Sequence, residues 1–259
     1  SQSPIFRVSA SGGTPVALTH LDSLKQETSH RWPYFLPDGR HFLFSTRTIS
    51  TGVRADVDAI FVSSLDGKER KFVIQATTNA AYADGYLICG LGAKLMAVAF
   101  DPAKLTTEGD PVSLVERIQI NGPDGAATFS VSSTNLLAYQ SRSSQTGSQL
   151  MIFDLTGKEE GHVGDQAEYW DVRFAPDGKR LAYALNDRLS NNLDIWIYDL
   201  SRESRTRFTY NTAPDRLPVW SRDGTQLVYA SNRKGVFDLY WKRLGTGQEE
   251  LLLESSENK

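Results

Sequence analysis

The sequence predicts an all-β fold, a β-propeller built of four-stranded antiparallel blades, and three observations carry that prediction. Asp-Gly turns recur 46 residues apart, short runs of apolar and aromatic residues flank each turn, and helical patterning is nearly absent. Four strands in roughly 40 to 50 residues are typical of one propeller blade. The best-formed unit is residues 174–183, where Pro176, Asp177 and Gly178 join two alternating strands through a tight turn.

Two columns of residues fix the period. The glycines of the Asp-Gly turns are separated by 46, 93 and 46 residues, and they are Gly39, Gly85, Gly178 and Gly224. The middle gap equals two periods, so we expect a degenerate turn at residues 132–135. A second column ends a later strand of each unit, with gaps of 90, 45 and 44 residues, and consists of Leu65, Leu155, Leu200 and Leu244.

This period divides a single domain, residues 1–259, into five full blades and one outer half-blade. Residues 5–19 match only the outer two strands of a blade, and residues 20–31 have the composition of a polar connection. The full blades are expected at about residues 32–76, 79–116, 126–163, 169–209 and 218–253. Because open sheet edges expose unpaired backbone, we expect a six-bladed ring or a longer array. The missing strands would lie upstream, downstream or in another chain.

Composition excludes several classes of function. The net charge of −3 argues against a nucleic-acid partner. The longest apolar run is far short of the roughly 20 residues that a membrane span requires, so no membrane contact by this segment is expected. A single cysteine, Cys89, excludes an internal disulfide and a cysteine-based zinc site, and the four histidines have no ligand spacing. We therefore expect no metal and no cofactor.

The repeat unit resembles that of TolB-like, or WD40-like, propellers. It consists of an aromatic residue, a Pro-Asp-Gly turn, a basic residue and an alternating strand, and residues 35–44 and 174–183 show it best. The likeness covers nearly the whole chain and is closest to the propeller regions of bacterial membrane-linked serine/threonine protein kinases. It implies an extracytoplasmic location, periplasmic or at the cell surface. No kinase or DNA-binding motif occurs in these residues, so the resemblance specifies the fold rather than the function.

No catalytic arrangement is evident in the sequence. A Gly-x-Ser-x-Gly elbow is missing, so the hydrolase domain that prolyl-oligopeptidase-like proteins join to a propeller is not in this chain. The Asp-Gly pairs lack the acidic series of a calcium loop, and a role in turns accounts for them.

One set of side chains forms a candidate binding site. Aligning the turns places the dipeptides His30-Arg31, Tyr169-Trp170 and Asp215-Arg216 at equivalent positions, four or five residues before the aromatic residue of each turn. In a propeller this segment enters the innermost strand beside the axial channel, where arginine and aspartate could hydrogen-bond and aromatic rings could stack. Alternatively, they form local salt bridges between blades. The channel-mouth candidates are His30, Arg31, Trp32, Tyr169, Trp170, Asp215 and Arg216.

Two functions remain open from the sequence alone. The first is a non-catalytic protein-interaction or ligand-sensing module of a larger bacterial signalling protein, which would bind a protein, a peptide or a small molecule at the channel mouth. The second is the propeller of an enzyme, either the substrate-gating domain of a prolyl-oligopeptidase-like peptidase or a lyase or glycosidase with its site in the channel. A purely structural spacer in a longer receptor is a third reading.

Overall fold

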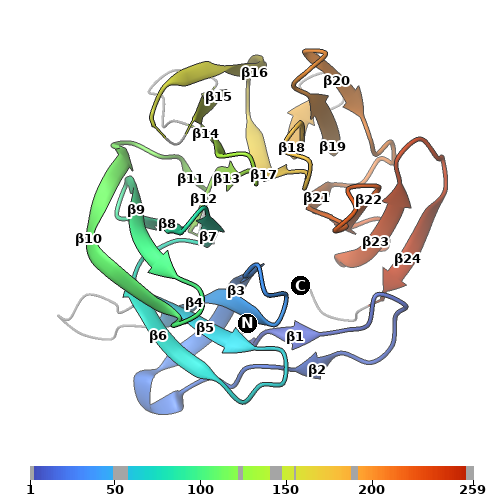
Figure 1. Cartoon of the computed structure of the whole chain (residues 1–259). Helices are drawn as coiled ribbons and strands as arrows, with labels where there is room; N and C mark the ends of the chain where they lie inside the picture. The colour runs from blue at the N-terminus through green and yellow to red at the C-terminus, as the bar shows by residue number, and fades with distance from the viewer. Residues whose placement is uncertain are drawn as a thin grey trace. The chain divides into compact units, whose positions relative to one another are not determined.

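The computed structural model describes residues 3–48, 58–121, 125–140, 148–154, 156–187 and 192–254. These residues form five four-stranded antiparallel sheets of the propeller type and two two-stranded sheets (Figure 1). Their only helix is one 3-10 turn, η1 (Ser23–Lys25). The predicted all-β propeller class is confirmed. The sequence also predicts loops at residues 48–58 and 141–148, which lie almost entirely outside the described residues.

The chain divides into two compact units. Unit 1 comprises residues 1–9 and 13–127, and unit 2 comprises residues 10–12 and 128–259. In unit 1 the two outer strands of the half-blade pair with each other, and two full blades and a short hairpin follow. The strands are β1 (Phe6–Arg7) and β2 (Val16–Ala17), β3 (Glu27–Phe35), β4 (His41–Thr48), β5 (Ala59–Ser64) and β6 (Arg70–Gln75), β7 (Ala80–Ala83), β8 (Tyr86–Leu91), β9 (Lys94–Asp101) and β10 (Thr106–Val115), and β11 (Ile120–Asn121) and β12 (Ala126–Ala127).

Unit 2 holds three full blades, in each of which the strands pair in chain order. The strands are β13 (Phe129–Val131), β14 (Leu136–Gln140), β15 (Ser148–Asp154) and β16 (Glu159–Ala167), β17 (Tyr169–Phe174), β18 (Arg180–Asp187), β19 (Asn192–Asp199) and β20 (Ser204–Arg207), and β21 (Asp215–Trp220), β22 (Gln226–Ser231), β23 (Asp238–Arg243) and β24 (Glu249–Leu253). Their first strands β13, β17 and β21 contact one another in sequence.

Apolar faces of successive blades form the cores. In unit 1, Leu43 and Ile60 of one blade pack with Leu87 and Val98 of the next. In unit 2 a corresponding cluster joins the blade that begins at β17 to the blade that begins at β21, and it includes Ile195, Phe208, Leu227 and Tyr229. Burial of these side chains against a neighbouring sheet is the main favourable contribution to such a fold.

Three of the four Asp-Gly turns work as their sequence predicts, and in the fourth Asp84 itself has a positive φ of 44°. Gly39, Gly178 and Gly224 have φ of 65°, 66° and 65°, a conformation that costs a residue with a Cβ about 1–2 kcal/mol. The aspartate before each glycine accepts hydrogen bonds from backbone N–H groups two or three residues on; Asp177 Oδ1, for example, accepts from Lys179 N at 2.9 Å. The degenerate turn at residues 132–135 is confirmed, with the Ser132 hydroxyl in the place of the aspartate.

Strand β3 begins at Glu27, inside the stretch that we expected to be a polar connection. The polarity of this stretch misleads because Glu27, Ser29 and His30 are buried. Arg70 donates to Glu27, and Glu27 also accepts from Asp22 N at 2.7 Å. Burial raises the pKa of Glu27, but these hydrogen bonds and that of His30 outweigh it, so the pKa is lowered overall. A satisfied polar network therefore replaces apolar packing at the start of this blade.

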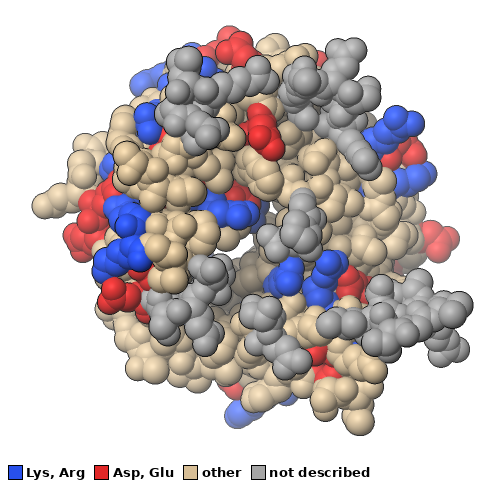
Figure 2. Space-filling model, turned by 180° about the vertical axis from the view of Figure 1, so that it is seen from behind, with Lys and Arg blue, Asp and Glu red and all other residues tan. Residues whose placement is uncertain are grey.

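On the face shown in Figure 2, basic and acidic side chains are interspersed. Ion pairs such as Arg40 with Glu69, 3.0 Å apart, and Lys104 with Asp101, 3.0 Å apart, agree with that pattern. In the part of the chain that the structure describes, no helix has the length and apolar character needed to cross a membrane.

A matched pair of glycine variants tests how the turns pack. A Cβ at Gly178 would overlap the Thr134 side chain of the preceding blade, whereas a Cβ at Gly39 meets nothing within 4 Å. Since both share the same φ, we expect Gly178→Ala to lower the free energy of unfolding by about 1 kcal/mol more than Gly39→Ala. Urea unfolding measures both values, and equal losses would contradict the packing described here.

Candidate functional site at the first-strand bulges

Three blades share a one-residue β-bulge in their first strand. The register shifts between Arg31 and Tyr34, between Trp170 and Arg173, and between Arg216 and Val219. The residue after the first of each pair has a left-handed backbone, and these residues are Trp32 (φ 55°), Asp171 (φ 55°) and Leu217 (φ 57°). Left-handed tryptophan and leucine are uncommon, and such backbone strain tends to cluster at functional sites. A bulge also re-aims the neighbouring side chains.

The residue two positions before each left-handed residue is buried. In unit 1 it is His30, whose Nδ1 lies 2.8 Å from Thr19 Oγ1 and whose Nε2 lies 3.0 Å from Glu27 Oε2. Burial lowers the pKa of His30 despite the nearby carboxylate, which favours the neutral ring. This side chain holds the start of the blade together and does not offer a surface to a ligand.

The equivalent residues of unit 2 are equally enclosed. Tyr169 donates to the carbonyl oxygens of Val163 and Asp165, at 3.0 and 2.6 Å, and burial raises its pKa to about 12. Asp215 is fully buried and accepts from Asn211 Nδ2 at 2.6 Å. Burial raises the pKa of Asp215. Of the seven candidates from the sequence, these two and His30 therefore lie in the interior.

The other four candidates are half-buried and lie beside the bulges. In unit 1, Arg31 Nε donates to Ser29 Oγ at 2.8 Å, and Trp32 is the left-handed residue itself. In unit 2, the Arg216 guanidinium lies 6.0 Å from the centre of the Trp170 ring, at the outer limit of a cation–π contact.

Asp171 completes the cluster in unit 2, and our reading of the sequence did not include it. Its Oδ2 accepts from Leu217 N at 3.1 Å and lies 3.7 Å from Arg216 Nε, so it ties β17 to β21. Arg216 Nε has no hydrogen-bond acceptor among the described residues. The signal that could have identified Asp171 is its alignment with Trp32 and Leu217 in the repeat.

This cluster combines an indole face, a guanidinium and a carboxylate on two adjacent first strands. Such groups bind peptides or small polar molecules by stacking and charge-assisted hydrogen bonds. Among the described residues, no three His, Cys, Asp or Glu side chains gather in a way that could hold a metal ion.

The comparisons with known proteins agree with the fold. A family model described as the TolB beta propeller domain matches residues 123–258, more than half of the chain. The chain therefore belongs to the TolB β-propeller family.

Solved structures show the same architecture. TolB from Acinetobacter baumannii is 15% identical, with a TM-score of 0.66, and the match covers 85% of this chain and 54% of that one. An oligogalacturonate lyase solved in complex with manganese is 18% identical, with a TM-score of 0.60, covering 96% of this chain and 71% of that one. At these identities the likeness shows the fold alone.

A curated relative, the uncharacterized peptidase YuxL of Bacillus subtilis (strain 168), is 33% identical over 69 residues. That match covers 25% of this chain and 10% of the relative, so the chain spans a small part of the relative's length.

Two substitutions at Asp171 test its structural role. Asp171→Ala removes the acceptor of the Leu217 N–H and the partner of Arg216, so we expect the free energy of unfolding to fall by about 1–2 kcal/mol. Asp171→Asn keeps an acceptor and tolerates the left-handed backbone, so it should lose less than half as much. Chemical denaturation measures both, and an alanine variant as stable as the wild type would contradict this role.

Proposed function

We propose that this chain is a non-catalytic interaction or ligand-sensing propeller within a larger bacterial signalling protein. The partner would be a protein, a peptide or a small molecule that binds at the first-strand bulges. One observation carries the proposal: Trp170, Asp171 and Arg216 present an aromatic face beside a guanidinium whose ion-pair distance, 3.7 Å, is longer than a hydrogen bond. Arg216 Nε itself is buried, but the Arg216 side chain is 28% exposed, so a ligand acceptor can reach the outer part of the guanidinium.

The bulges support this assignment because left-handed, bulky residues cost stability, and such strain clusters at functional sites. In unit 1, Arg31 occupies the position of the repeat that Trp170 and Arg216 have in unit 2, and Trp32, at the position of Asp171 and Leu217, adds an aromatic ring beside it. A location outside the cytoplasm and a link to a membrane-bound kinase are further parts of the proposal. They rest on the family resemblance of the repeat.

A second candidate function is the propeller of an enzyme. The 33% identity to part of an uncharacterized peptidase favours it, and so does the fold shared with a lyase. In that case the catalytic residues of a peptidase would lie in another part of a longer protein, and this chain would admit or orient the substrate.

A peptide-binding assay tests the proposal. An array of decapeptides of known, randomly chosen sequence identifies peptides that bind the wild-type chain. Fluorescence polarisation then measures the affinity of these peptides for the Trp170→Ala, Arg216→Ala and Arg31→Ala variants. We expect Trp170→Ala and Arg216→Ala each to weaken binding at least about 10-fold, as for residues at the centre of an interface. The Arg31→Ala variant tests the equivalent position of unit 1.

The matched control is Arg243→Ala, which removes an exposed arginine from β23 of the same unit. It should bind as the wild type does. If every variant binds as tightly as the control while remaining folded, the bulges are not the binding site. Cleavage of the bound peptides by the chain itself would favour the enzymatic alternative.

A further inference from the structure

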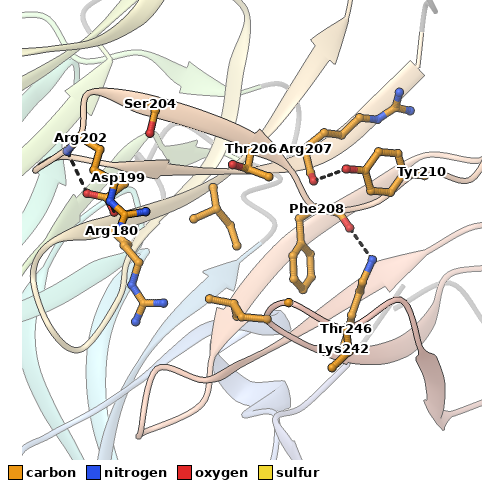
Figure 3. A pocket seen from close by; sticks show the side chains of 13 residues that line it. Arg180, Asp199, Arg202, Ser204, Thr206, Arg207, Phe208, Tyr210, Lys242 and Thr246 are labelled. Carbon is orange, nitrogen blue, oxygen red and sulfur yellow. Dashed lines mark hydrogen bonds and ion pairs between the residues drawn. The ribbon is translucent and has the colours of Figure 1, made fainter.

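A separate pocket of about 360 Å³ opens in unit 2 between the blade that begins at β17 and the blade that begins at β21 (Figure 3). Strands β19 and β20 line one side, and the end of β23 with the turn that follows it lines the other. The bulge residues Trp170, Asp171 and Arg216 are not part of it. The size falls within the range of small-molecule sites, roughly 300–1,000 Å³.

The pocket forms where the face of β20 that points toward the next blade has small polar side chains instead of large apolar ones. Phe208, directly after β20, is buried against the next blade. Thr206 and Ser204, on the same face of β20, are exposed. They pair with Ile197 and Asp199 of β19. Opposite them, Gly245 has no side chain to fill the space. The sheets therefore separate where these small residues meet.

The lining is rich in cations although the chain as a whole is acidic. Arg180, Arg202, Arg207 and Lys242 line the pocket, and Asp199 is the single acidic residue of the lining. The carboxylates that pair with three of these cations lie outside the lining; they are Asp177, Asp194 and Glu249. The pocket wall therefore presents mainly hydrogen-bond donors, which suit an anion.

The cations at the two ends differ in how firmly they are held. Figure 3 shows Arg180, Asp199 and Arg202 at one end and Phe208 and Lys242 at the other. Lys242 is buried and its Nζ donates to the Phe208 carbonyl oxygen at 2.7 Å, so it is committed to the fold. Arg202 is 83% exposed and its Nε lies 3.9 Å from Asp199, so its guanidinium can turn toward a ligand.

Arg180 is positioned in advance. Its Nε donates to Asp177 Oδ2 at 2.8 Å, and its Nη2 lies 2.7 Å from the same oxygen and donates to the Gly224 carbonyl oxygen at 3.0 Å. Asp177 therefore occupies the Nε–Nη2 edge, and the remaining N–H groups of Arg180, which are ordered before binding, can hold a carboxylate together with the mobile Arg202. Beyond this end, Ile197, Phe208 and Leu244 supply apolar surface within the same pocket.

We propose that this pocket binds a small organic anion, with a carboxylate between Arg180 and Arg202 and an aliphatic or aromatic body against Ile197, Leu244 and Phe208. The site is independent of the first-strand bulges and of whatever partner binds there. The propeller would then have a second binding site, specific for a small molecule.

Hexanoate is a suitable probe, with hexanamide as its uncharged counterpart and inorganic phosphate as an anion without an apolar body. Amide resonances in a ¹H–¹⁵N spectrum of the whole chain report binding, and we expect hexanoate to shift those of Ser204, Thr206 and Thr246. A ligand of this size should bind with a dissociation constant on the order of 1–10 mM.

Three variants make the test specific. Arg202→Ala removes a mainly exposed side chain and should weaken hexanoate binding about 3–10-fold without loss of folding. Thr206→Phe fills the pocket and should abolish the shifts. The control Arg205→Ala removes the same charge from the opposite face of β20, where Arg205 stacks over Trp196, and should bind as the wild type does.

Several outcomes would overturn the proposal. Equal shifts with hexanamide would show that the charge is not recognised, and equal affinity for phosphate would show that the apolar surface is not used. Hexanoate binding that is unchanged in Arg202→Ala, or an absence of shifts at the three amides in the wild type, would exclude the site itself.

Discussion

The placement of the candidate side chains depends on one backbone constraint, the extra residue in the first strand of three blades. Because side chains alternate across a strand, an insertion of one residue changes which of them face the interior. It buries His30, Tyr169 and Asp215 and leaves Arg31, Trp170 and Arg216 half-buried at the edge of the sheet. The constraint also explains why one repeated segment has two roles. Its buried member makes hydrogen bonds inside the protein, which for Tyr169 reach β16 of the preceding blade, and the residue beside it is available for contact.

The buried members achieve this in chemically different ways within the same geometry. His30 joins a network with Glu27 and Arg70, Tyr169 donates to two carbonyl oxygens, and Asp215 accepts from Asn211. The bonds of His30 and Tyr169 satisfy polar groups that would otherwise be costly to bury, whereas in Asp215 only Oδ2 is hydrogen-bonded, and Oδ1 is buried without a hydrogen-bond partner among the described residues. The repeat therefore conserves a backbone shape rather than a residue type. The variety of side chains at one position is compatible with a rigid frame and a variable recognition surface.

The period of the sequence was sufficient to predict the blades and their turns, since Asp-Gly and strand alternation are local properties. The degenerate turn at residues 132–135 followed from spacing alone. The start of β3 was not predictable from polarity, because Arg70, which donates to the buried Glu27, is distant in sequence. The bulge was not predicted either, although Pro33 and Pro218 directly follow two of the left-handed residues and proline within a strand often marks a bulge. The cation-rich pocket depends on the approach of two blades, which no local pattern encodes.

The backbone conformation of the bulge residues in solution is the most direct test of how these blades place their side chains. In a left-handed residue the amide and α protons of the same residue are closer together than in an extended one, so their nuclear Overhauser effect is stronger. We expect strong intraresidue effects at Trp32, Asp171 and Leu217, and weaker ones at the neighbouring Arg31, Trp170 and Arg216. Uniformly weak effects along these three strands would show regular extended backbone. That result would contradict the division of these residues into buried and half-buried side chains, and with it the binding site proposed at the bulges.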